Sequence, residues 1–249
     1  MTQYNISITS DIVCPWCYIG HTRLSRAITH HKSIHPNDTF HLSYKSFYLN
    51  PAAQTGDYSQ PPFPIPSSNR REYYASKFGP QRAIQIERMM IETAGREGLN
   101  FSFDGKTGPS RNGHRLVRYA QNHGGEDAQN RVMLGLWKRY FEDAVDITTL
   151  ETLTEVGVEA GLGNEKEVKA YLESGKDAKE VDDEAEEARQ KGINGVPNYE
   201  IQGIWEVSGA QEPRAFEQLF ARWKEMEKKK GAAEAANGTN GSSGGAACL

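Results

Sequence analysis

Near the N-terminus the chain reads Tyr4-Asn5-Ile6-Ser7-Ile8-Thr9-Ser10-Asp11-Ile12-Val13-Cys14-Pro15-Trp16-Cys17, an alternating run followed by two cysteines. The alternation of apolar and polar residues predicts a strand over residues 4–10. Pro15 suits the first position of a helix, and apolar residues recur at helical spacing from Trp16 to Ile28. The two thiols are therefore expected where a strand gives way to a helix.

This position favours redox chemistry at the cysteines. Unpaired amides in the first helical turn and the positive end of the helix dipole stabilise a thiolate at Cys14. Cys17 lies three residues further on the same helical face, within reach of Cys14, and its sulfur is expected to be less exposed. We predict that one thiol attacks a disulfide and that the other resolves the mixed disulfide.

A zinc site is the alternative reading of the same cysteines, because Cys14-x2-Cys17-x12-His30-x4-His35 has the ligand spacing of a zinc finger. Such a finger holds its cysteines in a hairpin turn, whereas Pro15 opens a helix here. At a rise of about 1.5 Å per residue, His30 would lie roughly 20 Å along the axis from Cys17, too far for one ion. The sequence therefore predicts no metal site.

Length and composition are those of a globular enzyme. The chain has 249 residues, of which 37% are hydrophobic and 25% charged, and its net charge is -4. There is no basic excess to indicate nucleic acid, and no apolar stretch is long enough to cross a bilayer. Three cysteines, two of them in one motif, do not make a framework of structural disulfides. We expect a soluble cytoplasmic protein.

The pattern after the first helix predicts one sheet that is interrupted by helices. A second strand is expected at residues 39–48, and the order strand, helix, strand implies parallel pairing with a right-handed crossover. Prolines crowd residues 50–68, which marks a loop into a different region. Apolar residues at helical spacing then dominate residues 70–190, so an all-helical insertion is predicted.

Strands return after the insertion. Residues 198–201 and 204–207 flank Gln202-Gly203, which predicts a tight hairpin. Residues 213–226 carry an apolar side and should form a helix that covers the sheet. From about Gly231 the chain is rich in Gly, Ala, Ser and Asn, and we expect disorder there, with Cys248 an inert exposed thiol.

Six segments of the chain match the motifs of a known family in order and spacing. They are Ser10-Asp11-Ile12-Val13-Cys14-Pro15-Trp16-Cys17-Tyr18-Ile19-Gly20, Phe47-Tyr48-Leu49-Asn50-Pro51, Asn112-Gly113-His114-Arg115-Leu116, Asp146-Ile147, Gly192-Ile193-Asn194-Gly195-Val196-Pro197 and Gly209-Ala210-Gln211. With them the chain, over roughly residues 4–226, resembles the DsbA-like thioredoxin-fold proteins, most closely the FrnE-type branch. Gly113 departs slightly from the pattern, since the family usually has alanine there.

The resemblance implies an α/β, thioredoxin-like fold. A central mixed sheet would be built from a right-handed βαβ unit and a C-terminal β-hairpin and helix, with a large all-helical insertion between them. The two halves of this fold would occupy residues 1–60 and 191–230. The insertion would take residues 61–190, and residues 231–249 would form the disordered tail.

The resemblance also implies how the site is built. A cis peptide bond before Pro197 would face the cysteine pair, and the proline would keep metals away from the thiols. The backbone of Val196 would pair with an extended substrate or with glutathione. No bound cofactor is implied, and glutathione would serve as a co-substrate.

Three further residues near the motif are candidates for the site. Trp16 offers an apolar platform for substrate, although core packing is the ordinary fate of a tryptophan. His114 begins an insertion helix and could contact substrate over the thiols, or pack under a loop. Asp11 could shuttle a proton to Cys17, although capping of the strand end is the favoured interpretation.

Other conspicuous residues have ordinary structural interpretations. His21 lies two helical turns beyond Cys14 and is interpreted as structural. The aromatic and methionine residues at 73, 74, 78, 89 and 90 fit a core better than a cofactor site. The acidic run over residues 176–187 is read as a solvated helix face.

Three classes of function remain, in order of preference. The first is a thiol-disulfide oxidoreductase or disulfide isomerase acting on protein thiols, protein disulfides or glutathione. The second is a glutathione-dependent transferase or isomerase of small aromatic metabolites, because relatives on this fold act on aromatic or chromene substrates, although with a serine-containing motif. The third is a chaperone or binding module, which would keep its activity when both cysteines are changed.

Overall fold

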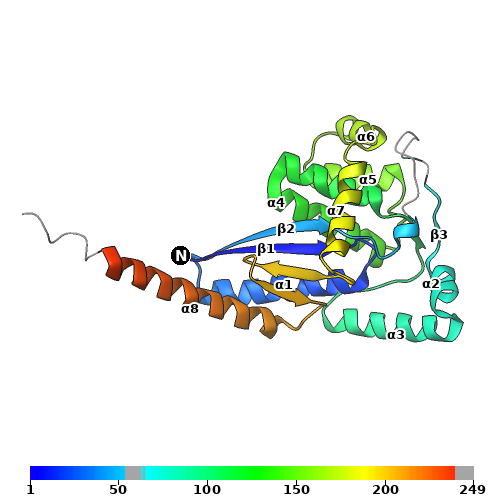
Figure 1. The fold of residues 1–249 in the computed structure, drawn as a ribbon. Coiled ribbons are helices and arrows are strands. Elements are labelled where there is room, and N and C mark those ends of the chain that lie inside the picture. The colour runs from blue at the N-terminus through cyan, green and yellow to red at the C-terminus, as the bar shows by residue number, and fades with distance from the viewer. Residues whose placement is uncertain (54–62, 64, 239–249) are drawn as a thin grey trace, which may run out of the picture.

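The computed structural model describes residues 1–53, 63 and 65–238. Its centre is a four-stranded sheet in the order β2-β1-β5-β6 (Figure 1). The strands are β1 (Gln3–Ser10), β2 (Thr39–Ser46), β5 (Asn198–Ile201) and β6 (Trp205–Ser208). β1 and β2 are parallel over their whole length, whereas β5 is antiparallel to β1 and β6 is antiparallel to β5. The sheet is therefore mixed, as predicted.

Helices cover both faces of this sheet. α1 (Pro15–Ile34) and α8 (Pro213–Gly238) pack against each other below the sheet in Figure 1. α4 (Arg111–Phe141) and α7 (Ala178–Gln190) pack against β2 above it. The unit β1-α1-β2, followed after the helical region by the hairpin β5-β6 and α8, confirms the predicted α/β, thioredoxin-like fold.

The region between the two parts of the sheet is helical, apart from one short ladder. Besides α4 and α7 it contains η1 (Pro51–Ala53), α2 (Arg70–Phe78), α3 (Pro80–Arg96), α5 (Leu150–Glu159) and α6 (Glu165–Glu173). The exception to the all-helical prediction is β3 (Ser68–Asn69), which pairs with β4 (Lys106–Thr107). Each strand is two residues long, too short to show an alternating pattern in the sequence.

A break at Gly79 divides the apolar stretch over residues 73–94 into two helices. Gly79 has φ +84°, a left-handed conformation that glycine adopts without steric cost, and Pro80 then starts α3. The result is a hairpin of two helices, α2 and α3, which lies beyond the N-terminal end of α1 in Figure 1.

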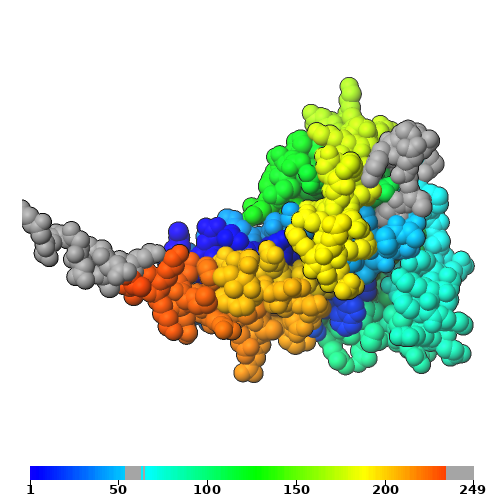
Figure 2. All heavy atoms as spheres, in the orientation of Figure 1, coloured from blue at the N-terminus to red at the C-terminus, as the bar shows by residue number. Residues whose placement is uncertain are grey.

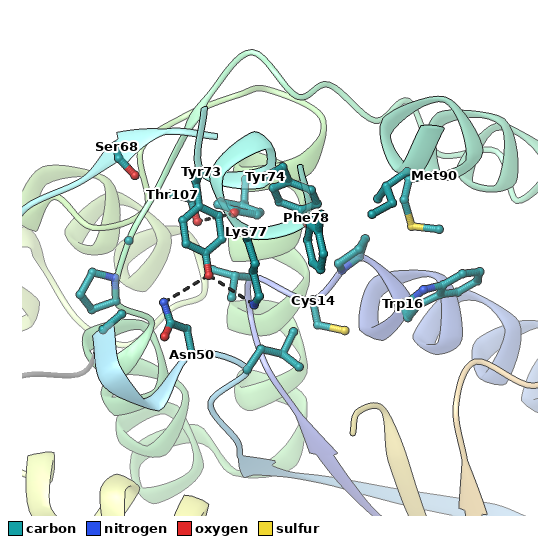
Figure 3. Close-up of a pocket in the computed structure, with 18 of the residues that line it drawn as sticks. Cys14, Trp16, Asn50, Ser68, Tyr73, Tyr74, Lys77, Phe78, Met90 and Thr107 are labelled. Atoms are coloured by element: carbon teal, nitrogen blue, oxygen red, sulfur yellow. Dashed lines mark hydrogen bonds between the residues drawn. The ribbon is translucent and has the colours of Figure 1, made fainter. Parts of the chain in front are cut away.

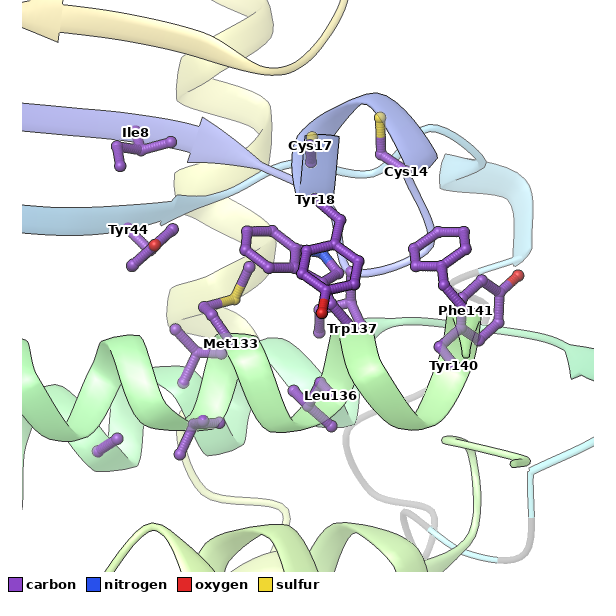
Figure 4. Packing of buried hydrophobic residues seen from close by; sticks show 14 of the residues in the cluster. Ile8, Cys14, Cys17, Tyr18, Tyr44, Met133, Leu136, Trp137, Tyr140 and Phe141 are labelled. Atoms are coloured by element: carbon purple, nitrogen blue, oxygen red, sulfur yellow. The ribbon is translucent and has the colours of Figure 1, made fainter. Parts of the chain in front are cut away.

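The apolar core is continuous from the sheet into the insertion. Tyr18 of α1 stacks on Trp137 of α4, with ring centroids 5.5 Å apart, and on Phe101, at 5.9 Å. Figure 4 shows Trp137 and Tyr18 directly beneath the two cysteines. Burial of such large rings is strongly stabilising. The helix that carries the cysteines is therefore fixed against the insertion as well as against the sheet.

The acidic run on α7 is not only a solvated face, which corrects the reading from sequence. Glu184 accepts a hydrogen bond from the backbone amide of Ser46 at 2.8 Å, and Asp182 accepts one from the hydroxyl of Tyr48, also at 2.8 Å. Arg111 pairs with Asp182 at 2.7 Å. Buried backbone amides need acceptors, and here acidic side chains supply one for the last residue of β2.

α8 is longer than predicted. It continues past Met226 to Gly238, so the expected disorder does not hold for residues 231–238, and Cys248 lies outside the described residues. Phe216 and Phe220 are buried, whereas the later part of the helix extends away from the body of the protein (Figures 1 and 2). Within the described ranges, none of the helices has the length and apolar character needed to span a membrane.

Candidate functional site

The two cysteines lie at the junction between β1 and α1. Cys14 is the N-cap residue of α1, with extended backbone, and Pro15 is the first helical residue. The amide of Cys17 donates to the carbonyl of Cys14 at 3.1 Å, which closes the first turn. Both cysteines are free thiols, with exposed fractions of 2% for Cys14 and 1% for Cys17.

Cys14 is in direct contact with the loop before β5. Its Sγ donates a hydrogen bond to the carbonyl oxygen of Val196 at 3.4 Å, and the Val196-Pro197 peptide bond is cis. Gly20 permits this approach of α1 to the loop. A Cβ atom at position 20 would lie 2.3 Å from the hydroxyl of Tyr199 and 3.0 Å from Cγ of Pro197.

Burial and the neighbouring Cys14 raise the pKa of the Cys17 thiol well above its ordinary value. The first and largest cause is desolvation, which disfavours the charged thiolate. The hydroxyl of Ser10 and the backbone of Asp11 oppose this effect by interacting favourably with the thiolate form. Cys17 is therefore held as a neutral thiol behind Cys14.

A cavity of about 750 Å³ opens over Cys14 (Figure 3). The motif lines it with Val13, Cys14, Pro15 and Trp16, and Gly195 and Val196 line it from the loop before β5. The remaining wall comes from the segments 49–53, 66–68 and 107–109, from Tyr140, and from the hairpin of α2 and α3. Trp16 is 37% exposed, so it faces the cavity rather than the core.

The profile of the DSBA-like thioredoxin domain matches residues 5–221. The chain belongs to this family. A search of curated protein sequences gave no match.

Three solved structures resemble this DSBA-like protein over most of its length. A probable DsbA oxidoreductase from Streptomyces coelicolor is 27% identical, with a TM-score of 0.73 over 89% of this chain and 91% of that one. The cytosolic disulfide reductase DsbM from Pseudomonas aeruginosa, solved with GSH, is 16% identical, with a TM-score of 0.54 over 88% and 99%. A 2-hydroxychromene-2-carboxylate isomerase is 15% identical, with a TM-score of 0.60 over 90% and 98%. The last two likenesses show the fold.

In this DSBA-like protein His114 lies behind the cysteine motif rather than over the thiols. Its ring is 2% exposed, stands edge-on to Tyr48, and does not line the cavity over Cys14. Its Nε2 lies 3.4 Å from a carboxylate oxygen of Asp11. The neighbouring Gly113 makes room for Ile12, because a Cβ atom there would lie 2.4 Å from Cδ1 of Ile12.

Asp11 joins the motif to the loop after β2. Its carboxylate accepts from the amide of Leu49 at 2.8 Å and from the amide of Val13 at 3.4 Å, and the residue is fully buried. These contacts use the carboxylate to satisfy backbone donors, which is the capping interpretation favoured from the sequence. The backbone of Asp11 interacts favourably with the thiolate form of Cys17.

His21 is a structural residue on α1. Its Nδ1 lies 2.7 Å from the hydroxyl of Tyr44, and its Nε2 lies 3.2 Å from the hydroxyl of Ser25. Because the Tyr44 hydroxyl donates to Asn130 at 2.9 Å, Nδ1 of His21 must be the donor to it. Burial lowers the pKa of His21 to about 4, so the ring is neutral at physiological pH.

The histidines of the alternative zinc pattern lie far from the cysteines along α1. Nδ1 of His30 lies 2.8 Å from a carboxylate oxygen of Glu217 on α8, and His35 follows the end of α1. Within the part of the chain that the structure describes, no three His, Cys, Asp or Glu side chains are grouped to hold a metal ion.

The sequence did not predict the part of the cavity wall that the α2–α3 hairpin supplies. The aromatic and methionine residues of the α2–α3 hairpin were interpreted as core, but Tyr73, Tyr74, Phe78 and Met89 line the cavity. Phe78 is 39% exposed and Met89 47%, and only Met90 is buried, at 1%. The available signal was Gly79-Pro80, which turns one apolar stretch into a hairpin with a face that the core does not cover.

Proposed function

We propose that this DSBA-like protein is a thiol-disulfide oxidoreductase that works through Cys14 and Cys17. The supporting observation is the placement of Cys14 at the N-terminus of α1, in the wall of the cavity and 3.4 Å from the carbonyl oxygen of Val196. Helix N-terminal amides stabilise the thiolate, which is the attacking species. Cys17 waits beside it as a buried thiol.

The reaction proceeds by two exchanges of sulfur. The Cys14 thiolate attacks one sulfur of a substrate disulfide, a bond forms between the two sulfurs, and the other substrate sulfur leaves as a thiolate. Cys17 then loses its proton and attacks Sγ of Cys14, which releases the second substrate thiolate and leaves a Cys14–Cys17 disulfide. Two electrons pass to the substrate. In the reverse direction the enzyme disulfide oxidises two substrate thiols.

The residues around Cys14 would position the substrate. Trp16 and Val196 line the cavity on either side of the motif, and Pro197 fixes the loop that carries Val196. Backbone groups of Val196 would pair with an extended substrate. His114 is assigned no substrate contact and Asp11 no proton transfer, because both lie behind the motif in structural contacts.

We further infer the FrnE-type branch, from the six matched sequence segments. Protein disulfides or glutathione are the proposed partners, with no bound cofactor and with a cytoplasmic location. The chain has three cysteines, two of them in one motif, and this lack of a framework of structural disulfides is in keeping with a reducing compartment.

Trapping of the mixed disulfide tests the oxidoreductase function. A Cys17→Ala variant lacks the resolving thiol, so incubation with oxidised glutathione or with a cell extract should leave a covalent adduct on Cys14, seen as a mass increase in intact-protein mass spectrometry. The adduct should disappear on adding dithiothreitol. The matched control is Cys14→Ala, which keeps the buried Cys17 and should stay unmodified. Both variants also carry Cys248→Ala, which removes the third thiol of the chain.

An adduct on Cys17 of the Cys14→Ala variant, or no adduct on Cys14 of the Cys17→Ala variant with any disulfide, would overturn the proposal.

The cavity favours a second candidate, a glutathione-dependent transferase or isomerase of small aromatic compounds. A mostly apolar cavity of about 750 Å³ has the size of a small-molecule binding site. An enzyme that acts only on exposed protein disulfides does not require such a cavity. This candidate predicts turnover without net oxidation of thiols. Cys17→Ala would then keep its full activity, whereas disulfide reductase activity would be lost.

A further inference from the structure

The cavity over Cys14 has an uneven distribution of charge. Of its described lining residues, Lys77 alone is charged, and none is acidic. Most of the remaining lining is apolar or aromatic, with a few neutral polar groups. Among these described residues a ligand with a positive charge would find no counter-ion. A ligand with one negative charge would find one in Lys77.

Lys77 belongs to a small cluster of hydrogen-bond donors. Its ammonium group donates to the hydroxyl oxygen of Tyr73 at 3.4 Å, and the side-chain amide of Asn50 donates to the same oxygen at 3.2 Å (Figure 3). Because that oxygen accepts two hydrogen bonds, the hydroxyl proton of Tyr73 points away from both donors and can be donated to a ligand. Lys77 and Tyr73 therefore present donors together, as an anion such as a carboxylate requires.

The apolar part of the cavity lies on the other side of Cys14. In Figure 3 Trp16 and Met90 stand to one side of the Cys14 sulfur, and Asn50, Tyr73 and Lys77 stand to the other. A ligand whose sulfur reaches Cys14 can thus place an apolar body against Trp16 while an acid group approaches Lys77. A volume of about 750 Å³ accommodates a molecule of this kind.

We propose that the cavity selects disulfides in which one half is an apolar or aromatic thiol with a single acid group. The inference rests on the proposed oxidoreductase function and specifies its substrate. That half, R–S, bonds to Cys14 and occupies the cavity, while the other half leaves as a thiolate. Cys17 then displaces R–S⁻, so two electrons reach the substrate and the Cys14–Cys17 disulfide forms. Glutathione fits less well, because it carries an ammonium group and lacks an apolar body.

Three disulfides distinguish this selectivity from general thiol reactivity. 5,5′-Dithiobis(2-nitrobenzoate) is aromatic with an acid group on each half, 4,4′-dithiodipyridine is aromatic and neutral, and oxidised glutathione is charged but not apolar. The fully reduced protein, with Cys248→Ala to remove the third thiol, is mixed with each disulfide. Saturable thiol release is followed by stopped-flow absorbance, or by mass spectrometry for glutathione. Rates are divided by those of a small dithiol reagent to remove intrinsic reactivity.

The decisive variant is Lys77→Gln, with Lys166→Gln as the matched control. Lys166 lies on α6 and is exposed, so both variants lose one positive charge but only one changes the cavity. For the nitrobenzoate disulfide we expect Lys77→Gln to raise the half-saturating concentration about tenfold, the usual size of one charge-assisted contact. Lys166→Gln should change it less than twofold. Neither variant should alter the reaction with dithiodipyridine.

A binding measurement separates failure of this inference from failure of the proposed function. 5-Methylthio-2-nitrobenzoate cannot undergo exchange, and calorimetry should show that it binds the wild type about tenfold more tightly than Lys77→Gln. Equal binding to both proteins, or a preference for oxidised glutathione over the aromatic disulfides, would overturn the inference while leaving the redox function intact. Absence of reaction at Cys14 with all three disulfides would instead overturn the redox function.

Discussion

The two walls of the cavity over Cys14 are built in different ways. The wall from the thioredoxin-like part is tightly packed, since Cys14 is almost completely buried and α1 approaches the loop at Pro197 so closely that position 20 has no room for a side chain. The wall from the insertion is a hairpin whose aromatic and methionine side chains remain partly exposed, such as Phe78 and Met89. The first wall holds the reacting sulfur, and the second shapes what can reach it.

The hairpin wall depends on one buried residue for its position. Arg70, the first residue of α2, is fully buried and donates to the carbonyl oxygens of Ser102 at 2.8 Å and Tyr140 at 2.6 Å. Its guanidinium also lies 3.6 Å from the centre of the Tyr140 ring. Arg70 thus ties the start of the hairpin to the loop before β4 and to α4.

The largest effect on stability should come from replacing Arg70, which anchors the hairpin wall. Arg70→Met leaves two buried carbonyl groups without their donors, so we expect the free energy of unfolding to fall by about 3 kcal/mol or more in urea denaturation. Arg71→Ala is the control, because Arg71 forms half-exposed ion pairs with Glu87 and Asp104 and should cost at most about 1 kcal/mol. Equal losses in the two variants would show that the hairpin is not anchored at Arg70.

Acid should destabilise the contact between the thioredoxin-like part and the insertion at His21, which contacts Tyr44 of β2 and lies against Trp137 of α4, with ring centroids 5.5 Å apart. Burial lowers the pKa of His21 to about 4 from an ordinary value of 6.5. Between these two pH values the unfolded chain binds a proton that the folded chain does not. The free energy of unfolding therefore decreases as the pH is lowered. The loss should approach about 3 kcal/mol near pH 4.

His21→Gln should therefore show a smaller decrease in stability between pH 6.5 and 4, measured by urea denaturation at each pH. His30→Gln is the control, because His30 is exposed on the same helix. If both variants keep the slope of the wild type, His21 does not control the acid sensitivity of the junction.

The smallest effect on stability, and the sharpest contrast between the walls, should come from Gly20→Ala. The added methyl group would meet Tyr199 and Pro197, so we expect a loss of about 1–3 kcal/mol and a displacement of Val196 from Cys14. Exchange with charged and neutral disulfides should slow alike, unlike the selective effect of Lys77→Gln. Gly95→Ala in α3, where a Cβ meets nothing within 4 Å, should be neutral or slightly stabilising. A Gly20→Ala protein with wild-type rates would show that this close approach is dispensable.

The thioredoxin-like part was predictable because its signals are local. Alternation over residues 4–10, a proline at the first helical position and the Gln202-Gly203 turn each act within a few residues, and each led to an element in the right place. Cys14 could be placed at the end of α1 for the same reason. The order of the elements then sufficed for the topology of the sheet.

The cavity wall was less predictable because it depends on contacts distant in sequence. The periodicity of residues 73–90 shows that one side is apolar but not what that side faces. In the structure much of it faces the cavity rather than the core. Likewise Asp182 and Glu184 look solvated in the sequence, and their partners Tyr48 and Ser46 lie more than 130 residues earlier. Tertiary contacts, rather than the local sequence, determine whether these side chains face solvent.

The contact between Gly113 and Ile12 links two positions 101 residues apart into one packing volume. Ile12 is fully buried and its Cδ1 fills the space that a methyl group on residue 113 would need. The glycine is thus the counterpart of the larger isoleucine, and in this chain a methyl group at position 113 would need a smaller side chain at position 12. The two residues therefore fill one volume between the cysteine motif and α4, and neither can be enlarged without a change in the other.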